Sequence, residues 1–220
     1  MACYLLYWAA QQFMGLLFAA MSAVNFLSGG KLFFRLRVVG TSAVKKLRRP
    51  VILTPNHKTY ADHFFIAAAF LFNFRILPMR TITADWAYRV PAIKLGFLLR
   101  GALGLLGAFP ERGGMGLLTA FKTIRKGQSV AVYPEGIAWP ETGIAEVKKG
   151  AAWLASKTGA PILPAAIKGI EHFGGREFFF GKREITVSFG SPFRIGPSDD
   201  LDAASQKIKS KIEELYYQNA

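Results

Sequence analysis

The chain has 220 residues, of which 51% are hydrophobic, and its 28 basic and 14 acidic residues give a formal net charge of +14. This length fits one folded domain with a full core, and the single cysteine, Cys3, excludes an intramolecular disulfide and a cysteine-built metal site. The apolar content favours contact with lipid or a partner, and the basic excess favours an anionic one: nucleic acid, anionic lipid or a phosphorylated substrate.

The first predicted element is an apolar helix over Tyr4–Leu27, because no charged side chain precedes Lys31. Such a helix would be roughly 36 Å long, enough to cross a bilayer core of about 30 Å. Four polar residues interrupt it, namely Gln11, Gln12, Ser22 and Asn25, and each is costly in hydrocarbon unless paired or near an interface. We expect residues 1–30 to be a membrane-associating helical segment that either spans the bilayer or lies in its interface. The alternative is a helix buried on the core of the protein itself.

A basic cluster follows this segment, and no acidic residue occurs before Asp62; it comprises Lys31, Arg35, Arg37, Lys45, Lys46, Arg48 and Arg49. Basic residues just after an apolar segment follow the positive-inside bias and are attracted to anionic headgroups. The sequence therefore predicts anionic membrane lipids as partners and a location at the cytoplasmic face of the cell membrane. Nucleic acid is not an expected partner, because no basic-aromatic recognition motif accompanies the charge.

Residues 31–220 are predicted to form one α/β domain with a mixed, largely parallel sheet flanked by helices. Short runs rich in Val and Ile predict strands over Val51–Thr54, Ser129–Tyr133, Pro161–Ile167 and Glu184–Phe189, with a weaker candidate at Leu103–Phe109. Helical spacing predicts helices over Gly114–Lys126, over Lys149–Thr158, and from a cap at Ser198-Asp199-Asp200 to about Tyr217.

The segment from Thr54 to Asp62 contains a candidate general base. A helix is expected to begin near Thr59, with that residue as its N-cap, so His57 would lie in the turn ahead of the helix that carries Asp62. The turn can bring the imidazole back to the carboxylate, which would fix its tautomer. The other ring nitrogen could then take a proton from a substrate hydroxyl. By itself, the His-x4-Asp spacing is a weak signal.

A metal site formed by His57, Asp62 and His63 is the rival interpretation. It is disfavoured because His63 follows Asp62 directly and would point elsewhere on a helix. The only other histidine is His172, and no second ligand-rich cluster occurs. We therefore expect no metal.

Three further segments are typical of ligand binding or strand ends. Glu135 and Gly136 follow a predicted strand, where open α/β sheets bind ligands, and could position a polar substrate. Arg112 lies beside two glycines just before a predicted helix, an arrangement suited to a phosphate. Pro161 and Pro164 bracket a strand, which favours a structural role. In isolation, Glu135 and Gly136 are better explained by an ordinary turn at the end of a strand.

Together and in this order, the four segments resemble the four blocks of the glycerolipid acyltransferase family, which includes 1-acylglycerol-3-phosphate acyltransferases. The first block is similar at Asn56, His57 and Asp62, the second at Arg112, the third at Pro134-Glu135-Gly136 and the fourth at Pro161 and Pro164. Lys149-Gly150 also looks like the family's lysine-glycine step into a helix. The resemblance covers about residues 33–195.

The resemblance implies an O-acyltransferase that moves a fatty acyl group from acyl-CoA or acyl carrier protein to a lysophospholipid hydroxyl, with no bound cofactor. It implies His57 as the base and Asp62 as its orienting partner. It also implies that Arg112, Glu135, Gly136 and Lys149 bind substrate. The apolar stretches Phe64–Phe72 and Phe97–Phe109 are candidate walls of an acyl-chain cleft, although core packing explains them equally well.

The chain departs from the family pattern directly after Gly136. The family usually continues with Thr-Arg, whereas this chain has Ile137-Ala138. A hydroxyl and a cation that would hold a phosphate are therefore missing, and Lys148 or Lys149 could replace the cation. The departure leaves open an acceptor without phosphate and a non-catalytic lipid-binding protein of the same shape.

Overall fold

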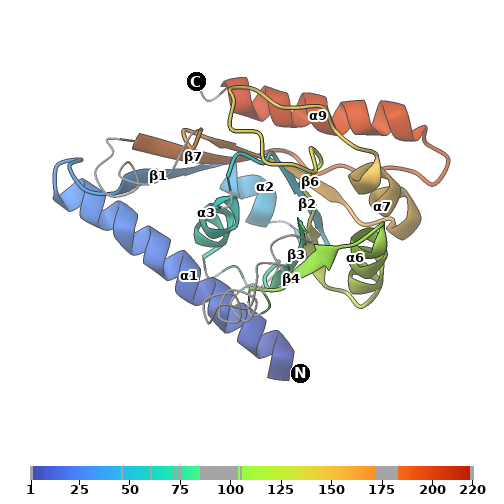
Figure 1. Ribbon diagram of the computed structural model, residues 1–220, viewed down its shortest axis with the longest axis horizontal. Coiled ribbons are helices and arrows are strands. Elements are labelled where there is room, and N and C mark those ends of the chain that lie inside the picture. The colour runs from blue at the N-terminus through green and yellow to red at the C-terminus, as the bar shows by residue number, and fades with distance from the viewer. Residues whose placement is uncertain are drawn as a thin grey trace.

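The computed structural model describes residues 2–45, 47–59, 61–71, 73, 76–84, 104, 106–171 and 183–218. Its centre is a seven-stranded sheet in the order β1-β7-β6-β2-β5-β3-β4 (Figure 1). The strands are β1 (Phe34–Val39), β2 (Ile52–Pro55), β3 (Met79–Ala84), β4 (Ala108–Glu111), β5 (Ser129–Ala131), β6 (Ile162–Lys168) and β7 (Arg183–Phe189).

The five strands from β6 to β4 run parallel to one another. β7 pairs antiparallel with β6, and β1 pairs parallel with β7. The predicted mixed, largely parallel sheet is therefore confirmed. The carboxyl ends of β2, β5, β3 and β4 lie along one edge, which is where open α/β sheets bind ligands.

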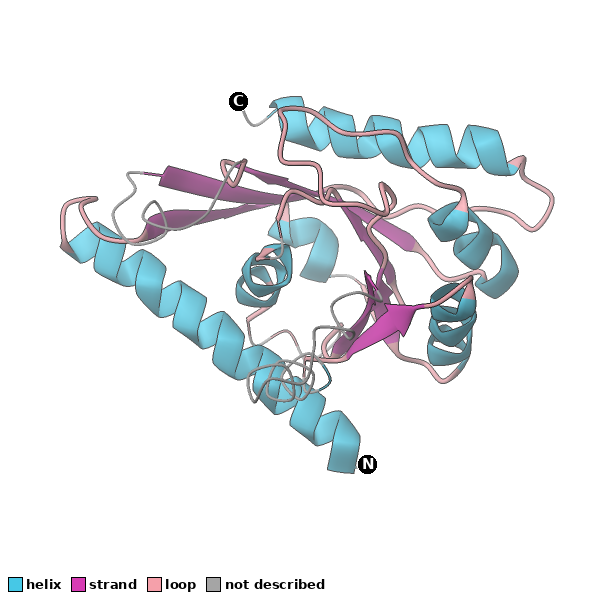
Figure 2. Cartoon of the chain, viewed as in Figure 1, coloured by secondary structure: helices cyan, strands magenta, loops and turns pink. Residues whose placement is uncertain are grey.

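Helices cover both faces of the sheet (Figures 1 and 2). One face carries α1 (Ala2–Leu27), α2 (Thr41–Lys45) and α3 (Asp62–Ala69), and the other carries α6 (Met115–Arg125), α7 (Gly150–Thr158) and α9 (Leu201–Gln218). Successive strand residues point into the two cores in turn: Leu53 packs on the α1–α3 side and Ile52 on the α6–α9 side. This alternation, with both faces buried, explains why β2 and β6 are nearly continuous apolar runs.

The long N-terminal helix α1 lies along the α3 side of the domain, with one face on the protein and one face exposed. Its Leu5–Leu27 stretch is long and apolar enough to cross a membrane by length and composition. Three of the four polar residues that interrupt the run, Gln11, Ser22 and Asn25, are hydrogen-bonded to residues outside the helix. Gln11 bonds Met79 and Leu106, and Asn25 bonds Leu32. These contacts tie α1 to the rest of the domain.

Several boundaries differ from the prediction. Helix α3 begins at Asp62, so the expected start near Thr59 is wrong. β5 ends at Ala131, two residues before the expected Tyr133. The weaker strand candidate is displaced to Ala108–Glu111; residues 103 and 105 lie outside the described residues. β1 and β3 were not predicted.

Both unpredicted strands have polar residues in their patterns. β1 reads Phe-Arg-Leu-Arg-Val-Val, and its arginines lie 3.7 Å from Glu184 on β7. β3 reads Met-Arg-Thr-Ile-Thr-Ala. Neither is a short continuous apolar run, so the criterion that found the central strands missed them.

Candidate active site

Two neighbouring strand ends carry the candidate site. β2 leads into Asn56-His57-Lys58, and β5 leads into Tyr133-Pro134-Glu135. Because β2 and β5 are adjacent and parallel, the two turns meet at the same edge of the sheet. The side chain of Asn56 is fully buried and continues the β2–β6 pairing, since its amide donates to Ile167 O (2.9 Å) and accepts from Ile167 N (2.6 Å).

The structure brings His57 and Asp62 together. His57 Nδ1 lies 2.7 Å from Asp62 Oδ2. The Asp62 side chain is fully buried, whereas the His57 side chain keeps 19% of its surface exposed. Within the described residues, no group bonds His57 Nε2. A carboxylate at Nδ1 holds the proton there and leaves Nε2 as an acceptor at the surface, which is the arrangement that a general base requires.

Asp62 also organises the turn that carries the base. Its carboxylate accepts from the backbone N–H of Lys58 at 2.7 Å and of Thr59 at 3.2 Å. The Thr59 hydroxyl accepts from Ala61 N and donates to Asp62 Oδ1. Thr59 therefore stabilises the turn before α3, and the predicted cap at Thr59 is wrong, because the N-cap is Ala61 and no side chain caps the helix.

Glu135 lies inside the protein. Its side chain is 1% exposed, and its two oxygens accept from the backbone N–H groups of His57 (2.6 Å) and Ala145 (2.8 Å). Burial raises the pKa of this carboxyl, and the two backbone hydrogen bonds oppose that rise. The structure thus shows Glu135 fastening the His57 turn to the segment around Ala145. Its expected contact with a substrate stays a prediction.

Gly136 makes a turn that other residues disfavour. Its φ is +71°, a region that glycine adopts readily. A Cβ at this position would lie 2.8 Å from Lys148 Nζ, so the lysine side chain passes directly over the glycine. The backbone N–H of Lys148 donates to Pro134 O at 2.8 Å, and that of Trp139 donates to His57 O at 2.7 Å. The exposed side chain of Lys148 therefore lies over the turn next to the base.

Lys58, directly after the base, is buried with 1% of its surface exposed. Its ammonium donates to the carbonyl oxygens of Glu141 and Gly143 and lies 5.2 Å from the ring centroid of Tyr216 on α9. Desolvation lowers the pKa of Lys58, while the negative charge of Glu135 is the largest effect opposing it. Lys58 thereby joins the base's turn to the 141–143 segment and to α9.

His63 and Tyr133 form a second pair beside the base. His63 Nδ1 lies 2.5 Å from Tyr133 Oη, and the Tyr133 ring centroid lies 4.4 Å from that of His57. His63 therefore points away from Asp62, as predicted from their adjacency on the helix. Within the described part of the chain, no group of three or more His, Cys, Asp or Glu side chains could hold a metal; His172 lies outside it.

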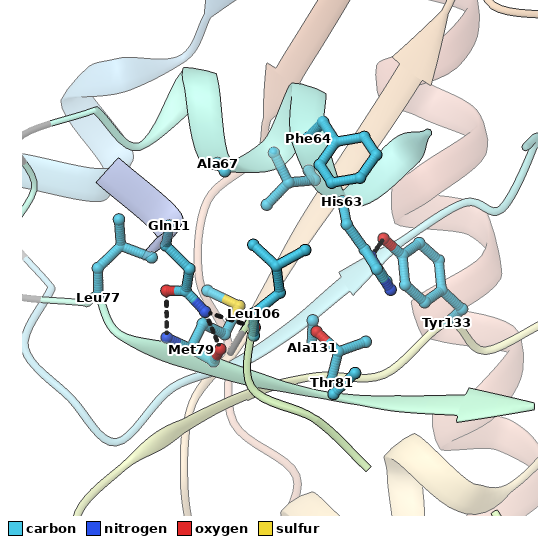
Figure 3. Close-up of a pocket in the computed structure, with 12 residues that line it drawn as sticks. Gln11, His63, Phe64, Ala67, Leu77, Met79, Thr81, Leu106, Ala131 and Tyr133 are labelled. Atoms are coloured by element: carbon cyan, nitrogen blue, oxygen red, sulfur yellow. Dashed lines mark hydrogen bonds between the residues drawn. The ribbon is translucent and has the colours of Figure 1, made fainter. Parts of the chain in front are cut away.

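His63 and Tyr133 also line a cavity between α3 and the sheet (Figure 3). It contains about 510 Å³ of space that no protein atom fills, with the open solvent at its mouth included. The predicted wall Phe64–Phe72 contributes Phe64, Ile66 and Ala67, and residue 72 lies outside the described residues. From the other predicted wall, Leu106 and Ala108 line the cavity, whereas residues 97–103 and 105 lie outside the described residues.

The remaining two candidates lie away from His57. Arg112 is exposed after β4, which is separated from β2 by β5 and β3. Lys149 is exposed, and its ammonium lies 2.7 Å from a carboxylate oxygen of Asp202 at the start of α9. The structure does not bring Lys149 to the base, and both substrate contacts stay predictions.

Sequence reasoning missed the roles of Lys58, Tyr133 and His63. A lysine next to the candidate base was a signal for Lys58, but nothing local indicated that its ammonium is buried under α9. The tyrosine that ends the β5 run was assigned to a strand. Its contact with His57 follows from the β2–β5 adjacency, which appears only once the sheet order is known.

A family model described as acyltransferase matches residues 35–168, more than half of the chain. The chain is 23% identical over 184 residues to the chloroplastic 1-acyl-sn-glycerol-3-phosphate acyltransferase BAT2 of Brassica napus, covering 82% of this chain and 52% of that protein. It is 24% identical over 143 residues to the 1-acyl-sn-glycerol-3-phosphate acyltransferase of Borreliella burgdorferi, covering 65% of this chain and 55% of that protein. The chain thus spans about half the length of the curated relatives it matches.

The fold is similar to a crystal structure of the 1-acyl-sn-glycerophosphate acyltransferase PlsC from Thermotoga maritima. The TM-score is 0.65 at 20% sequence identity, covering 94% of this chain and 81% of the other. At this level of identity the likeness establishes the fold, and the chemistry must be argued from the site.

Proposed function

Because the chain belongs to the acyltransferase family, we propose that it transfers a fatty acyl group from an acyl thioester to the hydroxyl of a lysophospholipid such as 1-acylglycerol-3-phosphate. The observation that carries the proposal is the buried Asp62 carboxylate 2.7 Å from His57 Nδ1. His57 lies just after the carboxyl end of the central parallel strand β2, and Asp62 is the first residue of α3. The names of the relatives support the same substrate class.

In the proposed reaction, His57 Nε2 takes the proton of the acceptor hydroxyl while the hydroxyl oxygen attacks the thioester carbonyl carbon. Asp62 stabilises the imidazolium that forms. The new C–O bond remains when the C–S bond breaks, and His57 returns the proton to the departing thiolate. No covalent bond to the protein is needed, so His57 acts as base first and acid second.

The acceptor headgroup would meet the positive side chains at the same edge of the sheet. The side chain of Lys148 lies over Gly136. Gly136 directly follows Glu135, whose carboxylate accepts a hydrogen bond from the His57 backbone. It can supply the cation that the sequence lacks at Ala138. Arg112 lies further along the strand ends and suits a phosphate through its planar fork of donors. Of the two lysines considered from the sequence, this assigns the headgroup to Lys148.

The cavity behind Tyr133 is the proposed site for the acyl chain. Most of its lining is apolar, with Phe64, Ala67, Leu77 and Met79 among its walls. Tyr133 borders both this cavity and His57, so a chain in the cavity would place its carboxyl end near the base. The structure gives no preference between coenzyme A and acyl carrier protein as the donor carrier.

We propose that α1 holds the domain at the membrane by lying in the interface, consistent with residues 1–30 as the membrane-associating segment. Its outward face carries large apolar side chains that are at least 37% exposed: Leu5, Leu6, Phe13, Leu16, Leu17, Val24, Phe26 and Leu27. Its inward face is hydrogen-bonded to the domain through Gln11 and Asn25. An apolar stripe on a docked helix is typical of interfacial binding. The basic residues around β1 would favour anionic lipids on the cytoplasmic face.

The direct test incubates the full chain in anionic vesicles with acyl-CoA, or with acyl carrier protein thioester, and with 1-acylglycerol-3-phosphate or monoacylglycerol. Mass spectrometry then identifies the acylated product. We expect phosphatidic acid from the phosphate-bearing acceptor. Product only from the neutral acceptor would contradict the phosphate assignment, and binding without turnover would indicate a non-catalytic lipid-binding protein. Asp62→Asn should lower kcat about 100-fold or more with little change in KM.

A further inference from the structure

His57, Asp62, His63 and Tyr133 form a closed ring of contacts. Asp62 and His63 are consecutive on the first turn of α3, and they face two neighbouring strand ends. Asp62 bonds His57 Nδ1 at 2.7 Å, and His63 Nδ1 bonds Tyr133 Oη at 2.5 Å. The ring closes because the aromatic ring of Tyr133 lies against the imidazole of His57, with centroids 4.4 Å apart and planes at 35°. Each of the four side chains is therefore held by two others or by the helix.

We propose that Tyr133 is a positioning residue for His57: its ring covers one face of the imidazole and stabilises the imidazolium formed on proton uptake, while His63 anchors its hydroxyl. The effect of Tyr133 on catalysis rests on the proposed function. Asp62 constrains the imidazole within the ring plane, through Nδ1. Tyr133 constrains it from above the plane, so the two contacts together fix the direction of Nε2 toward the acceptor.

The direction of the His63–Tyr133 hydrogen bond follows from the environment of the pair. Burial, with a smaller effect of the nearby His57, lowers the pKa of His63 to about 3, so its imidazole is neutral at pH 7. Burial raises the pKa of Tyr133 well above its ordinary value, so the phenol keeps its proton. Tyr133 Oη–H can then donate to Nδ1 of neutral His63, which leaves the His63 proton on Nε2. A donating phenol next to a neutral imidazole holds the Tyr133 ring in one orientation.

The charge that develops on His57 is set by few groups. Among the described residues, the titratable side chains around it are Asp62 and His63 from α3 and Tyr133 and Glu135 from the turn after β5; Lys58 is its neighbour in the chain, and Lys148 lies over Gly136. Only Tyr133 presents a π face to the imidazole within this set. The negative π face of an aromatic ring stabilises a cation beside it, and we expect the effect on the titration of that cation to be about half a pH unit.

The test compares Tyr133→Phe, which keeps the ring, with Tyr133→Leu, which removes it. Two readouts are used on the full chain: kcat against pH, and the midpoint of the His57 proton titration followed through the ring resonances of isotope-labelled protein. With Tyr133→Leu we expect kcat to fall at least 10-fold and the midpoint and acidic limb to move about half a pH unit lower. With Tyr133→Phe, the titration midpoint and the acidic limb of the pH profile should keep their wild-type positions, while kcat falls a few-fold. Adding His63→Leu to Tyr133→Phe should cause little further loss, because the two share one contact.

Val187 on β7 is fully buried, and the variant Val187→Ala controls for general destabilisation. It should lower the melting temperature without moving the titration midpoint. The inference is overturned if Tyr133→Leu leaves the midpoint unchanged and lowers kcat no more than Val187→Ala does. If the wild type makes no acylated product but the midpoint still falls in Tyr133→Leu, the proposed function fails and the contact between Tyr133 and His57 stands.

Discussion

Glu135 Oε1 accepts a hydrogen bond from the backbone N–H of His57 over 2.6 Å. The bond joins the turn after β5 to the turn after β2, and the second carboxylate oxygen joins both to Ala145. The acidic residue of the Pro-Glu-Gly turn thus holds the backbone of the candidate base, while Asp62 holds its side chain. Two buried carboxylates from different elements therefore position one imidazole.

Glu135→Gln tests this positioning role. One oxygen is replaced by an NH₂ group that faces a backbone donor, so a buried hydrogen bond is lost and the unfolding free energy should fall by about 1–3 kcal/mol. Since the backbone of His57 loosens, kcat should fall about 10-fold or more while KM for the lysolipid changes less than threefold. Steady-state kinetics and thermal unfolding measure both. A large rise in KM with unchanged kcat would instead indicate direct contact with the acceptor.

Lys148→Met removes the ammonium that lies over Gly136. A charged hydrogen bond to phosphate contributes about 1.5–3 kcal/mol, so KM for 1-acylglycerol-3-phosphate should rise at least 10-fold. Activity with a neutral monoacylglycerol, where measurable, should not change. The matched control is Lys149→Met, whose ammonium pairs with Asp202 at the surface and which should keep the wild-type KM. Equal KM values in the two variants would remove Lys148 from the headgroup site.

The exposed face of α1 is predicted to bind lipid. Replacing Phe13 and Leu17 by aspartate places two charges on that face, where the wild-type side chains are 66% and 44% exposed. Because neither residue belongs to the buried core, we expect the melting temperature to change by only a few degrees. Flotation with anionic vesicles should fall at least 10-fold. The control is a double aspartate substitution at exposed Lys126 and Lys157, outside α1. Unchanged flotation of the α1 variant would contradict interfacial binding.

His63 makes stability depend on pH. Its folded pKa of about 3 lies below the ordinary unfolded value near 6.5. Between these values the unfolded chain binds the extra proton, so stability is lost as the pH falls through 6.5. From pH 7.5 to pH 5 this group alone should lower the unfolding free energy by at most about 2 kcal/mol. Chemical denaturation of wild type and His63→Gln at both pH values isolates the effect. Equal pH dependence in the two proteins would refute it.

The central part of the fold follows from the sequence because the physics there is local. β2 and β6 are short apolar runs bounded by turn residues, and α6 and α7 repeat apolar residues at helical spacing. β1 was missed because arginines alternate along it; their side chains are exposed to solvent and lie 3.7 Å from Glu184 on β7. That pairing joins residues about 150 apart in the sequence, and no local pattern encodes it.

In the candidate site, too, contacts between residues close in sequence could be predicted, and contacts between distant residues could not. The contact of His57 with Asp62 spans five residues, so spacing and turn geometry could predict it. The role of Glu135 could not be predicted, because its partner is a backbone N–H 78 residues away. The polar interruptions of the N-terminal helix are similar: Gln11 is explained by Met79, which reaches it only through the tertiary fold.

The measurement that tests the account most directly is acyl transfer by His57→Gln. Glutamine keeps a polar side chain of similar size but cannot take up a proton near pH 7, so the fold should persist while the base is lost. With acyl thioester and 1-acylglycerol-3-phosphate, both thiol release and phosphatidic acid formation should fall by at least 1,000-fold, with vesicle flotation unchanged. Thiol release and lipid product near wild-type rates in a folded His57→Gln protein would contradict the assignment of His57 as the base.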